Sequence, residues 1–192
     1  MEECHIRATN LACRRGDRLL FAGLSLALGP GEALQLAGAN GIGKSSLMRI
    51  LAGLARPYSG EVDRQGALAL LDERPALDEQ LPLGKALAFW RRLDGGEAVG
   101  LDRLGLEALL DVPVRYLSTG QRKRAALARM LGQRAPIWLL DEPLNGLDTS
   151  AVALVEELIA SHLAQGGLAV IASHQTFALP SLTRLAMAEH VA

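Results

Sequence analysis

Nine consecutive residues carry the clearest chemistry in this sequence. They are Gly38, Ala39, Asn40, Gly41, Ile42, Gly43, Lys44, Ser45 and Ser46, and the first eight fit the pattern G-x-x-x-x-G-K-S. Glycines at this spacing let consecutive backbone N–H groups turn inward around an anion. Lys44 can then reach the β and γ oxygens of a triphosphate, and Ser45 can bind Mg²⁺. The pattern predicts a loop for a nucleoside triphosphate; the alternative is a glycine-rich turn that matches by accident.

Two carboxylates and a histidine follow predicted strands further along the chain. Asp141 and Glu142 come directly after the apolar residues 137–140, and His174 follows the apolar residues 168–172. Ligands of open α/β sheets bind at the carboxyl ends of the strands, so we expect these side chains at one edge. There Asp141 suits an outer-sphere Mg²⁺ role, Glu142 can polarise an attacking water, and His174 can contact the γ-phosphate. Mere surface charge and a structural histidine are the alternatives.

A second helix start combines a good N-cap with positive charge. Three basic residues at 122–124 follow Leu117, Ser118, Thr119, Gly120 and Gln121. Ser118 or Thr119 can cap the helix, and the unpaired amides of its first turn favour an anion. Two interpretations stay open, a second anion site and an ordinary capped helix with a solvated basic face. Further on, Asp148 predicts the start of another helix, which ends at the glycines 166–167.

The elements that position these groups can be traced from apolar patterns. Residues 33–37 predict a strand that runs into the glycine loop. The helix after the loop is predicted from spacings of i, i+3, i+4 and i+7, which are occupied by Leu47, Ile50, Leu51 and Leu54. At its N-terminus, free amides and the helix dipole favour phosphate.

The chain divides into two kinds of sequence. Alternating residues within 5–28 predict a small antiparallel sheet, and residues 67–71 predict a buried strand. Helical stripes then appear between these strands and residue 137, at Leu83, Ala86, Leu87, Trp90, Leu101 and Leu104. We therefore expect one domain, in which residues 1–72 and 137–192 form the nucleotide-binding α/β core and residues 73–136 form an inserted helical subdomain.

Composition excludes several classes of function. The chain has 192 residues, 21% of them charged, and a formal net charge of −1, which gives no sign of nucleic acid or an anionic lipid surface as partner. No apolar run approaches the roughly 20 residues that span a bilayer, and the acidic start does not resemble a signal peptide. We expect a cytosolic protein. Its two cysteines, Cys4 and Cys13, are too few for a disulfide framework and are expected to be reduced.

Taken in order, these motifs resemble those of the ATPase subunits of ABC transporters. The resemblance runs through the phosphate loop, residues 117–121, Asp141 with Glu142, residues 145–148 and His174, and spans nearly the whole chain. It implies an α/β fold of the P-loop NTPase, RecA-like kind, with an N-terminal antiparallel β subdomain and an inserted helical subdomain. It also implies ATP and Mg²⁺ as cofactors. Residues 117–121, the signature of this family, would contact ATP bound by a second copy in a homodimer, and Asp148 would belong to the D-loop.

Within this family, three further stretches are similar to the haem-exporter ATPases of cytochrome c biogenesis, namely residues 18–21, 60–62 and 173–175. That resemblance implies a subunit on the cytoplasmic face of the bacterial inner membrane, docked on multi-spanning membrane subunits. Its ATP hydrolysis would support haem delivery to a periplasmic haem chaperone.

Three other interpretations stay open. One is an exporter of another substrate. A second is a soluble ABC ATPase acting on the ribosome or DNA, which the single ATPase half and the lack of sustained heptads disfavour. A third is an inactive nucleotide-binding regulator, against which the complete set of catalytic residue types argues.

Two stretches depart from the family pattern. Arg74 stands where the family has a glutamine, and a guanidinium cannot accept a hydrogen bond or bind Mg²⁺. Gln80 is the nearby candidate to replace it. Residues 14–16, Arg-Arg-Gly, stand where an aromatic side chain would stack on adenine, although a guanidinium can itself stack on a π face.

Overall fold

The computed structural model describes residues 4–72, 75–95, 100–179 and 182–191. Its strands are β1 (His5–Arg15), β2 (Arg18–Leu28), β3 (Ala33–Ala37), β4 (Ser59–Gln65), β5 (Leu68–Leu71), β6 (Ile137–Asp141), β7 (Leu168–Ala172) and β8 (Leu182–Ala186). Its α-helices are α1 (Lys44–Leu51), α2 (Leu83–Asp94), α3 (Thr119–Gly132) and α4 (Thr149–Ala164), and short 3₁₀ helices cover Glu107–Leu109, Val114–Tyr116 and Met187–His190.

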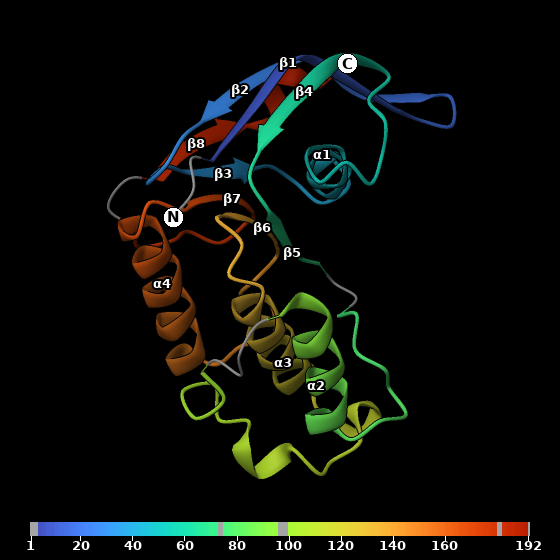
Figure 1. Ribbon diagram of the computed structural model, residues 1–192. Coiled ribbons are helices and arrows are strands. Elements are labelled where there is room, and N and C mark those ends of the chain that lie inside the picture. Colours follow the sequence, from blue (N-terminus) through green and yellow to red (C-terminus); the bar gives the residue numbers. More distant parts are fainter. Residues whose placement is uncertain (1–3, 73–74, 96–99, 180–181, 192) are drawn as a thin grey trace.

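A parallel sheet of five strands forms the centre of the molecule, in the order β5-β6-β7-β3-β8 (Figure 1). Strands β6 and β7 are buried at every position, as their uninterrupted apolar sequences predict. The predicted strands at 33–37, 67–71, 137–140 and 168–172 are confirmed. Strand β8 was not predicted, because it is short and partly exposed and its polar residues hide the apolar pattern.

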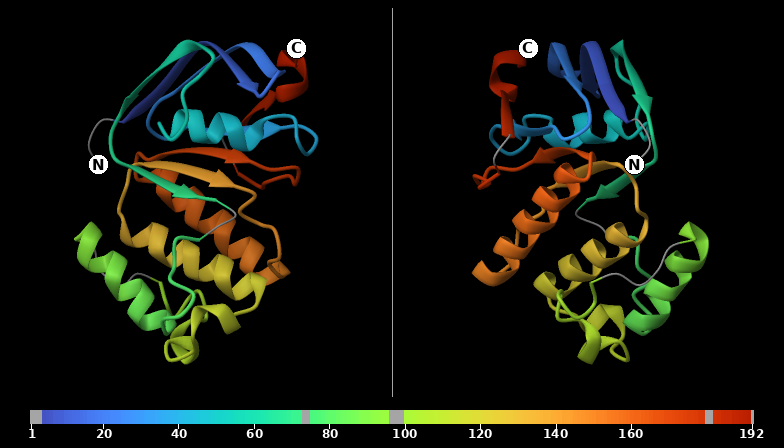
Figure 2. Two further views of the ribbon diagram at one scale, coloured as in Figure 1. Left: turned by 90° about the vertical axis from the view of Figure 1, so that its right-hand side faces the viewer. Right: turned by 60° about the vertical axis from the view of Figure 1, so that its left-hand side comes forward.

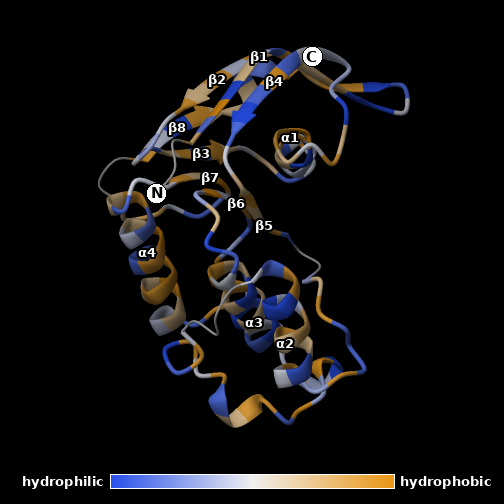
Figure 3. Cartoon of the chain, viewed as in Figure 1, coloured by the Kyte–Doolittle hydropathy of each residue, from blue (hydrophilic) through white to orange (hydrophobic). Residues whose placement is uncertain are grey.

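The predicted antiparallel sheet is confirmed, with strands longer than expected. β1 pairs with β2 over their whole length, from Ile6 opposite Leu28 to Arg15 opposite Arg18, and β4 pairs with the other edge of β1. Register shifts along β1 interrupt the simple alternation of residues along the strand. Short strands were expected from that alternation. β4 is mostly exposed and hydrophilic (Figure 3).

Helix α1 lies between the two sheets, as the turned views make clear (Figure 2). Leu47 and Leu51 are fully buried in a core that also includes Phe21 of β2 and Val170 of β7. The helix is shorter than its predicted stripe. It ends at Leu51 because Gly53 takes a left-handed backbone with φ of 75°, and Leu54 is 62% exposed.

Helices α3 and α4 cover the opposite face of the parallel sheet, and α2 packs outside α3 (Figures 1 and 2). The prediction of a helix around Leu101 and Leu104 is wrong. Left-handed glycines at 100 and 105 bracket this segment, which forms turns, although Leu104 is buried. Among the described residues, no helix combines the length and hydrophobicity that a membrane span needs.

Both cysteines are free and buried in the core between the sheets. The Cys4 thiol lies 3.6 Å from the Gly166 carbonyl oxygen, and the Cys13 thiol shares a hydrogen bond with the Ser46 side chain. Burial raises the pKa of both thiols. Both thiols therefore favour the protonated form at neutral pH.

Candidate nucleotide site

A cleft of about 540 Å³ opens at the carboxyl edge of the parallel sheet. Six of the nine predicted loop residues line it, together with both carboxylates and the histidine that were expected there; these are Asn40, Gly41, Gly43, Lys44, Ser45, Ser46, Asp141, Glu142 and His174. The parallel order of β6, β7 and β3 brings these groups together from distant parts of the sequence. The structure therefore places them at one edge, as expected.

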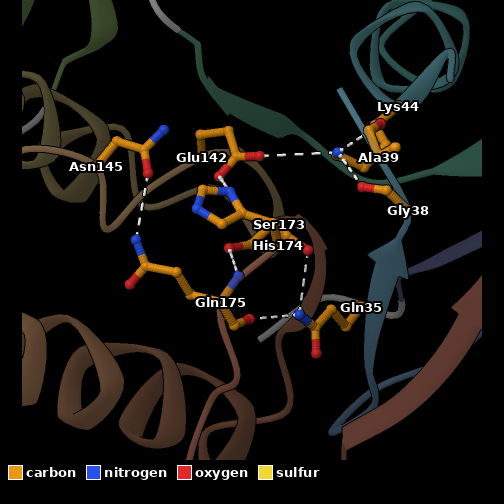
Figure 4. A network of polar contacts seen from close by, with 9 residues as sticks. All are labelled: Gln35, Gly38, Ala39, Lys44, Glu142, Asn145, Ser173, His174 and Gln175. Atoms are coloured by element: carbon orange, nitrogen blue, oxygen red, sulfur yellow. Dashed lines mark hydrogen bonds and ion pairs between the residues drawn. The ribbon is translucent and has the colours of Figure 1, made fainter. Parts of the chain in front are cut away.

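Lys44 is the positive centre of the cleft. It is 6% exposed, and its ammonium group donates hydrogen bonds to the carbonyl oxygens of Gly38, at 2.7 Å, and Ala39, at 3.3 Å (Figure 4). The same nitrogen lies 3.9 Å from Glu142 Oε1. Hydrogen bonds to the loop's own carbonyls hold the flexible side chain in place, so its charge is fixed where phosphate oxygens would arrive.

Gly43 shows why the loop needs glycine. It precedes the first residue of α1 with φ of 112°, and a Cβ atom there would lie 3.0 Å from Phe21 Cδ1. A larger residue would be strained in its backbone and would press on a buried ring. The loop therefore packs closely against β2 directly before the first residue of α1.

Glu142 has an unusual backbone for a residue with a side chain. Its φ is 47°, in the left-handed region, and its N–H donates to the Ala172 carbonyl at 2.8 Å. This turn directs a carboxylate that is only 9% exposed toward the cleft, beside Asp141, which ends β6. Strain retained in the backbone at such a position is a mark of functional sites.

His174 completes a contact between the ends of two strands. Its Nδ1 lies 3.1 Å from Glu142 Oε2, and because an ionised carboxylate only accepts, the proton of this hydrogen bond belongs to the imidazole (Figure 4). The His174 side chain is 54% exposed, so the rest of the ring is open to a ligand. Lys44, Glu142 and His174 therefore form one chain of polar contacts across the cleft.

Sequence reasoning missed several residues around the cleft. Arg18 and Leu20 line it, as does Arg15 from the stretch that stands where an adenine-stacking aromatic was expected. Asn145 lines it too, and it is the first residue of the motif at 145–148 that the family resemblance included. Arg15 and Arg18 are opposite each other at the β1–β2 turn. The antiparallel register of β1 and β2 is the signal from which this pair could have been found. Gln35 was also missed. A glutamine inside the apolar run 33–37 is a visible signal, since a buried amide needs hydrogen-bond partners.

The signature residues 117–121 do not line this cleft within one chain. Ser118 is the N-cap of α3, and it forms a capping box with Gln121, whose N–H donates to Ser118 Oγ at 3.2 Å. Gly120 packs so closely that a Cβ there would lie 2.7 Å from the Gly146 carbonyl oxygen. The role of this helix start toward ATP on a second copy stays a prediction.

Asp148 is the N-cap of α4, as expected, and does not line the cleft. Its Oδ1 accepts a hydrogen bond from the Ser150 hydroxyl at 2.7 Å and another from the Ala151 amide at 2.8 Å. These two bonds lower the pKa of the Asp148 carboxyl, so it remains ionised at neutral pH. Asp148 therefore lies where the segment after Glu142 meets the start of α4.

The departure at Arg74 cannot be placed, because residues 73 and 74 lie outside the described residues. Gln80, the candidate substitute, is described. Its side chain accepts a hydrogen bond from Arg115, which like Gln80 lies between β5 and β6 in the sequence. Gln80 does not line the cleft. Gln80 therefore does not take the place of the family's glutamine in this conformation.

The fold and this cleft define a P-loop ATPase of the ABC type. The sequence model of the family described as ABC transporter matches residues 21–145. The cytochrome c biogenesis ATP-binding export protein CcmA of Novosphingobium aromaticivorans is 60% identical over 187 residues, which cover 97% of this chain and 97% of that protein. The protein of the same name from Sphingopyxis alaskensis is 54% identical, over 92% of this chain and 93% of that one. The chain therefore belongs to the ABC transporter family, and to its group of cytochrome c biogenesis ATP-binding export proteins.

Solved structures support the fold. An ABC transporter ATP-binding protein from Pyrococcus furiosus superposes with a TM-score of 0.82 at 21% identity, covering 98% of this chain and all of that one. A metal-chelate type ABC transporter in an inward-facing conformation gives a TM-score of 0.74 at 24% identity, covering 90% of this chain and 74% of that one. At such identities the likeness concerns the fold alone. The predicted family and fold class are confirmed, and ATP binding follows from the family.

Proposed function

We propose that this chain is the ATP-hydrolysing subunit of an ABC export complex that acts in cytochrome c biogenesis. One observation carries the proposal: a buried Lys44, a buried Glu142 and His174 meet in a single cleft beside the phosphate loop. The names of its relatives supply the biological process. Haem is the substrate that we assign, with delivery to a periplasmic haem chaperone as the outcome.

In the proposed reaction, Lys44 and the amides of the phosphate loop bind the β- and γ-phosphates and neutralise their charge. A water oxygen attacks the γ-phosphorus, the bond to the β–γ bridging oxygen breaks, and ADP leaves. Glu142 accepts the proton of the attacking water. His174, held by its hydrogen bond to Glu142, contacts the γ-phosphate and keeps the carboxylate aligned.

The donor set of the cleft suits Mg²⁺. Ser45 and Asp141 both line it and offer oxygen atoms, the ligands that this ion prefers. Among the described residues, no group of three or more His, Cys, Asp or Glu side chains is placed to hold a metal ion. We propose that Ser45 and Asp141 hold Mg²⁺, directly or through water. The ion would neutralise charge on the β- and γ-phosphates.

Two copies of the chain are proposed to close on ATP. The N-terminus of α3, capped by Ser118, offers unpaired amides but lies outside the cleft of its own chain. A two-fold arrangement would bring residues 117–121 of one copy onto the ATP of the other. Residues 73–136 would act as the helical subdomain that transmits this closure to multi-spanning subunits, at the cytoplasmic face of the inner membrane.

The test of the enzymatic part is ATP hydrolysis by the purified chain and by its complex with membrane subunits. Lys44→Ala should lower the rate by about a hundredfold or more, because the γ-phosphate loses its neutralising cation. Lys85→Ala, which removes an exposed lysine of α2 away from the cleft, is the matched control and should keep the rate. An active Lys44→Ala variant would contradict the proposal.

The biological part has a separate test. Cells that carry Lys44→Ala in place of the natural protein should fail to make c-type cytochromes, measured by haem staining of their proteins. Normal cytochrome c content in such cells would remove the haem assignment. It would leave an ATPase that exports another substrate or works outside a transporter.

A further inference from the structure

Gln35 is a buried polar side chain that the proposed mechanism does not use. It stands in the middle of β3, between Leu34 and Leu36, and is 2% exposed. A carboxamide in such an apolar place is unfavourable unless it is hydrogen-bonded. The hydrogen-bond partners of the Gln35 side chain therefore indicate its role.

The Gln35 side-chain amide donates hydrogen bonds to the residues that flank His174, the proposed catalytic histidine. Its Nε2 donates to the carbonyl oxygens of Ser173, at 3.3 Å, and Gln175, at 2.6 Å (Figure 4). These are the residues immediately before and after His174. The Ser173 N–H also donates to the Leu36 carbonyl, so three hydrogen bonds attach this turn to β3.

The contact extends to the segment that follows Glu142. Gln175 Nε2 donates to Asn145 Oδ1 at 3.3 Å, and Asn145 lines the cleft. β3 itself runs directly into the phosphate loop. One series of amide contacts thus joins the strand before the loop, the turn with His174 and the segment after the proposed base.

We propose that Gln35 is a positioning residue for hydrolysis, which acts by holding His174 against Glu142. The inference rests on the proposed function, because it assigns a role within that reaction. Without the two bonds, the turn at 173–175 keeps one of its three hydrogen bonds to β3, from the Ser173 N–H to the Leu36 carbonyl, and the 3.1 Å contact between His174 Nδ1 and Glu142 Oε2 loosens. Lys44 and the loop amides stay in place, so ATP binding is preserved while the chemical step slows.

The test is Gln35→Met, which keeps length and volume and removes both donated hydrogen bonds. We expect kcat of the purified chain to fall by about tenfold, below the roughly hundredfold contribution of general acid–base catalysis, with KM for ATP nearly unchanged. Gln165→Met, at the exposed end of α4, is the matched control and should leave both constants unchanged. Gln35→Leu repeats the test if the methionine variant does not fold.

A double-mutant cycle separates positioning from general stability. In a His174→Ala background, Gln35→Met should cause no further loss of kcat, since its effect passes through the missing imidazole. A loss of the same size in both backgrounds would overturn the inference, as would an unchanged kcat in Gln35→Met alone.

A spectroscopic measurement does not depend on turnover. The imidazole ¹⁵N resonances of His174 should shift in Gln35→Met and stay in place in Gln165→Met. Absence of that shift overturns the inference even if the wild-type chain hydrolyses ATP. A wild-type chain that shows no hydrolysis, alone or with its membrane subunits, contradicts the proposed function instead, while the NMR comparison still decides whether Gln35 orients His174.

Discussion

At the scale of single residues, Glu142 is the side chain on which the proposed chemistry depends most. Its left-handed backbone and its contacts with Lys44 and His174 fix a buried carboxylate at the wall of the cleft. An ionised carboxylate can take a proton from water, and an amide of the same shape cannot.

Replacing this carboxylate should separate binding from hydrolysis. We expect Glu142→Gln to bind ATP with nearly normal affinity and to hydrolyse it at least about a hundredfold more slowly. The trapped nucleotide should then hold two copies together, which size-exclusion chromatography with ATP would detect. Glu61→Gln, an exposed position on β4, is the control. If Glu142→Gln stays monomeric and active, the base is another residue.

Residues of the cleft could be predicted where a short motif carries them. Lys44, Glu142 and His174 each stand beside a strand or helix whose pattern is visible locally. Gln35 has no such motif, because its partners lie about 140 positions away in sequence and are reached only through the pairing of β3 with β7. Arg18 was missed for a similar reason, since its place at the cleft depends on the register of β1 against β2.

At the scale of elements, helix α4 is anchored to the central sheet through a buried histidine. The His162 ring stacks on Trp138 of β6 with centroids 3.8 Å apart, and its Nε2 lies 3.1 Å from the Pro136 carbonyl oxygen and 3.3 Å from that of Leu168. Burial lowers the pKa of His162, so the folded chain favours the neutral ring.

This histidine should make the folded state sensitive to acid. The unfolded chain binds a proton at His162 near the ordinary histidine pKa of about 6.5, whereas the folded chain binds it only at lower pH. The contribution to the free energy of unfolding is therefore complete above about pH 6.5 and is lost as the pH falls below it.

The measurement is urea unfolding at several pH values. His162→Gln should show a shallower fall of the free energy of unfolding between about pH 7 and about pH 5 than the wild type. His190→Gln, near the end of the chain, should keep the wild-type slope. Equal slopes for His162→Gln and wild type would show that the buried ring is not the sensitive group.

Elements were predictable where one pattern dominates. β6 and β7 are apolar throughout and were found, and Ser118 and Asp148 marked their helix starts correctly. Where glycines interrupt a pattern, apolar spacing alone misled. It extended α1 to Leu54 and suggested a helix around Leu104, because a stripe of leucines does not reveal the left-handed backbone between them.

At the scale of the whole molecule, the parallel sheet is shared by two cores. Leu139 faces the core that contains α1, while Trp138 and Leu140 face the core that contains α3 and α4. The cleft lies at the carboxyl edge of this sheet. Helices α2 and α3 lie on the side of the sheet opposite α1 (Figure 2). In the proposed complex, the membrane subunits would sense ATP closure as a movement of residues 73–136 relative to the cleft.

The proposed membrane partners lead to a prediction about location in the cell. In cells that contain the membrane subunits, the chain should sediment with inner membranes and be released by high pH carbonate. In cells that lack those subunits, it should remain in the supernatant. Sedimentation without the partners would contradict the proposed docking.

The two buried thiols give a measure of how often the antiparallel sheet separates from the rest of the molecule. Cys4 and Cys13 lie just before and near the end of one long strand, β1, and a thiol-specific reagent can reach neither while that strand is in place. Labelling is then limited by the opening of β1, so its rate reports a local unfolding equilibrium. If ATP closes the cleft, whose wall includes the β1–β2 turn, Cys13 should be labelled more slowly with ATP present, and mass spectrometry can follow each thiol separately.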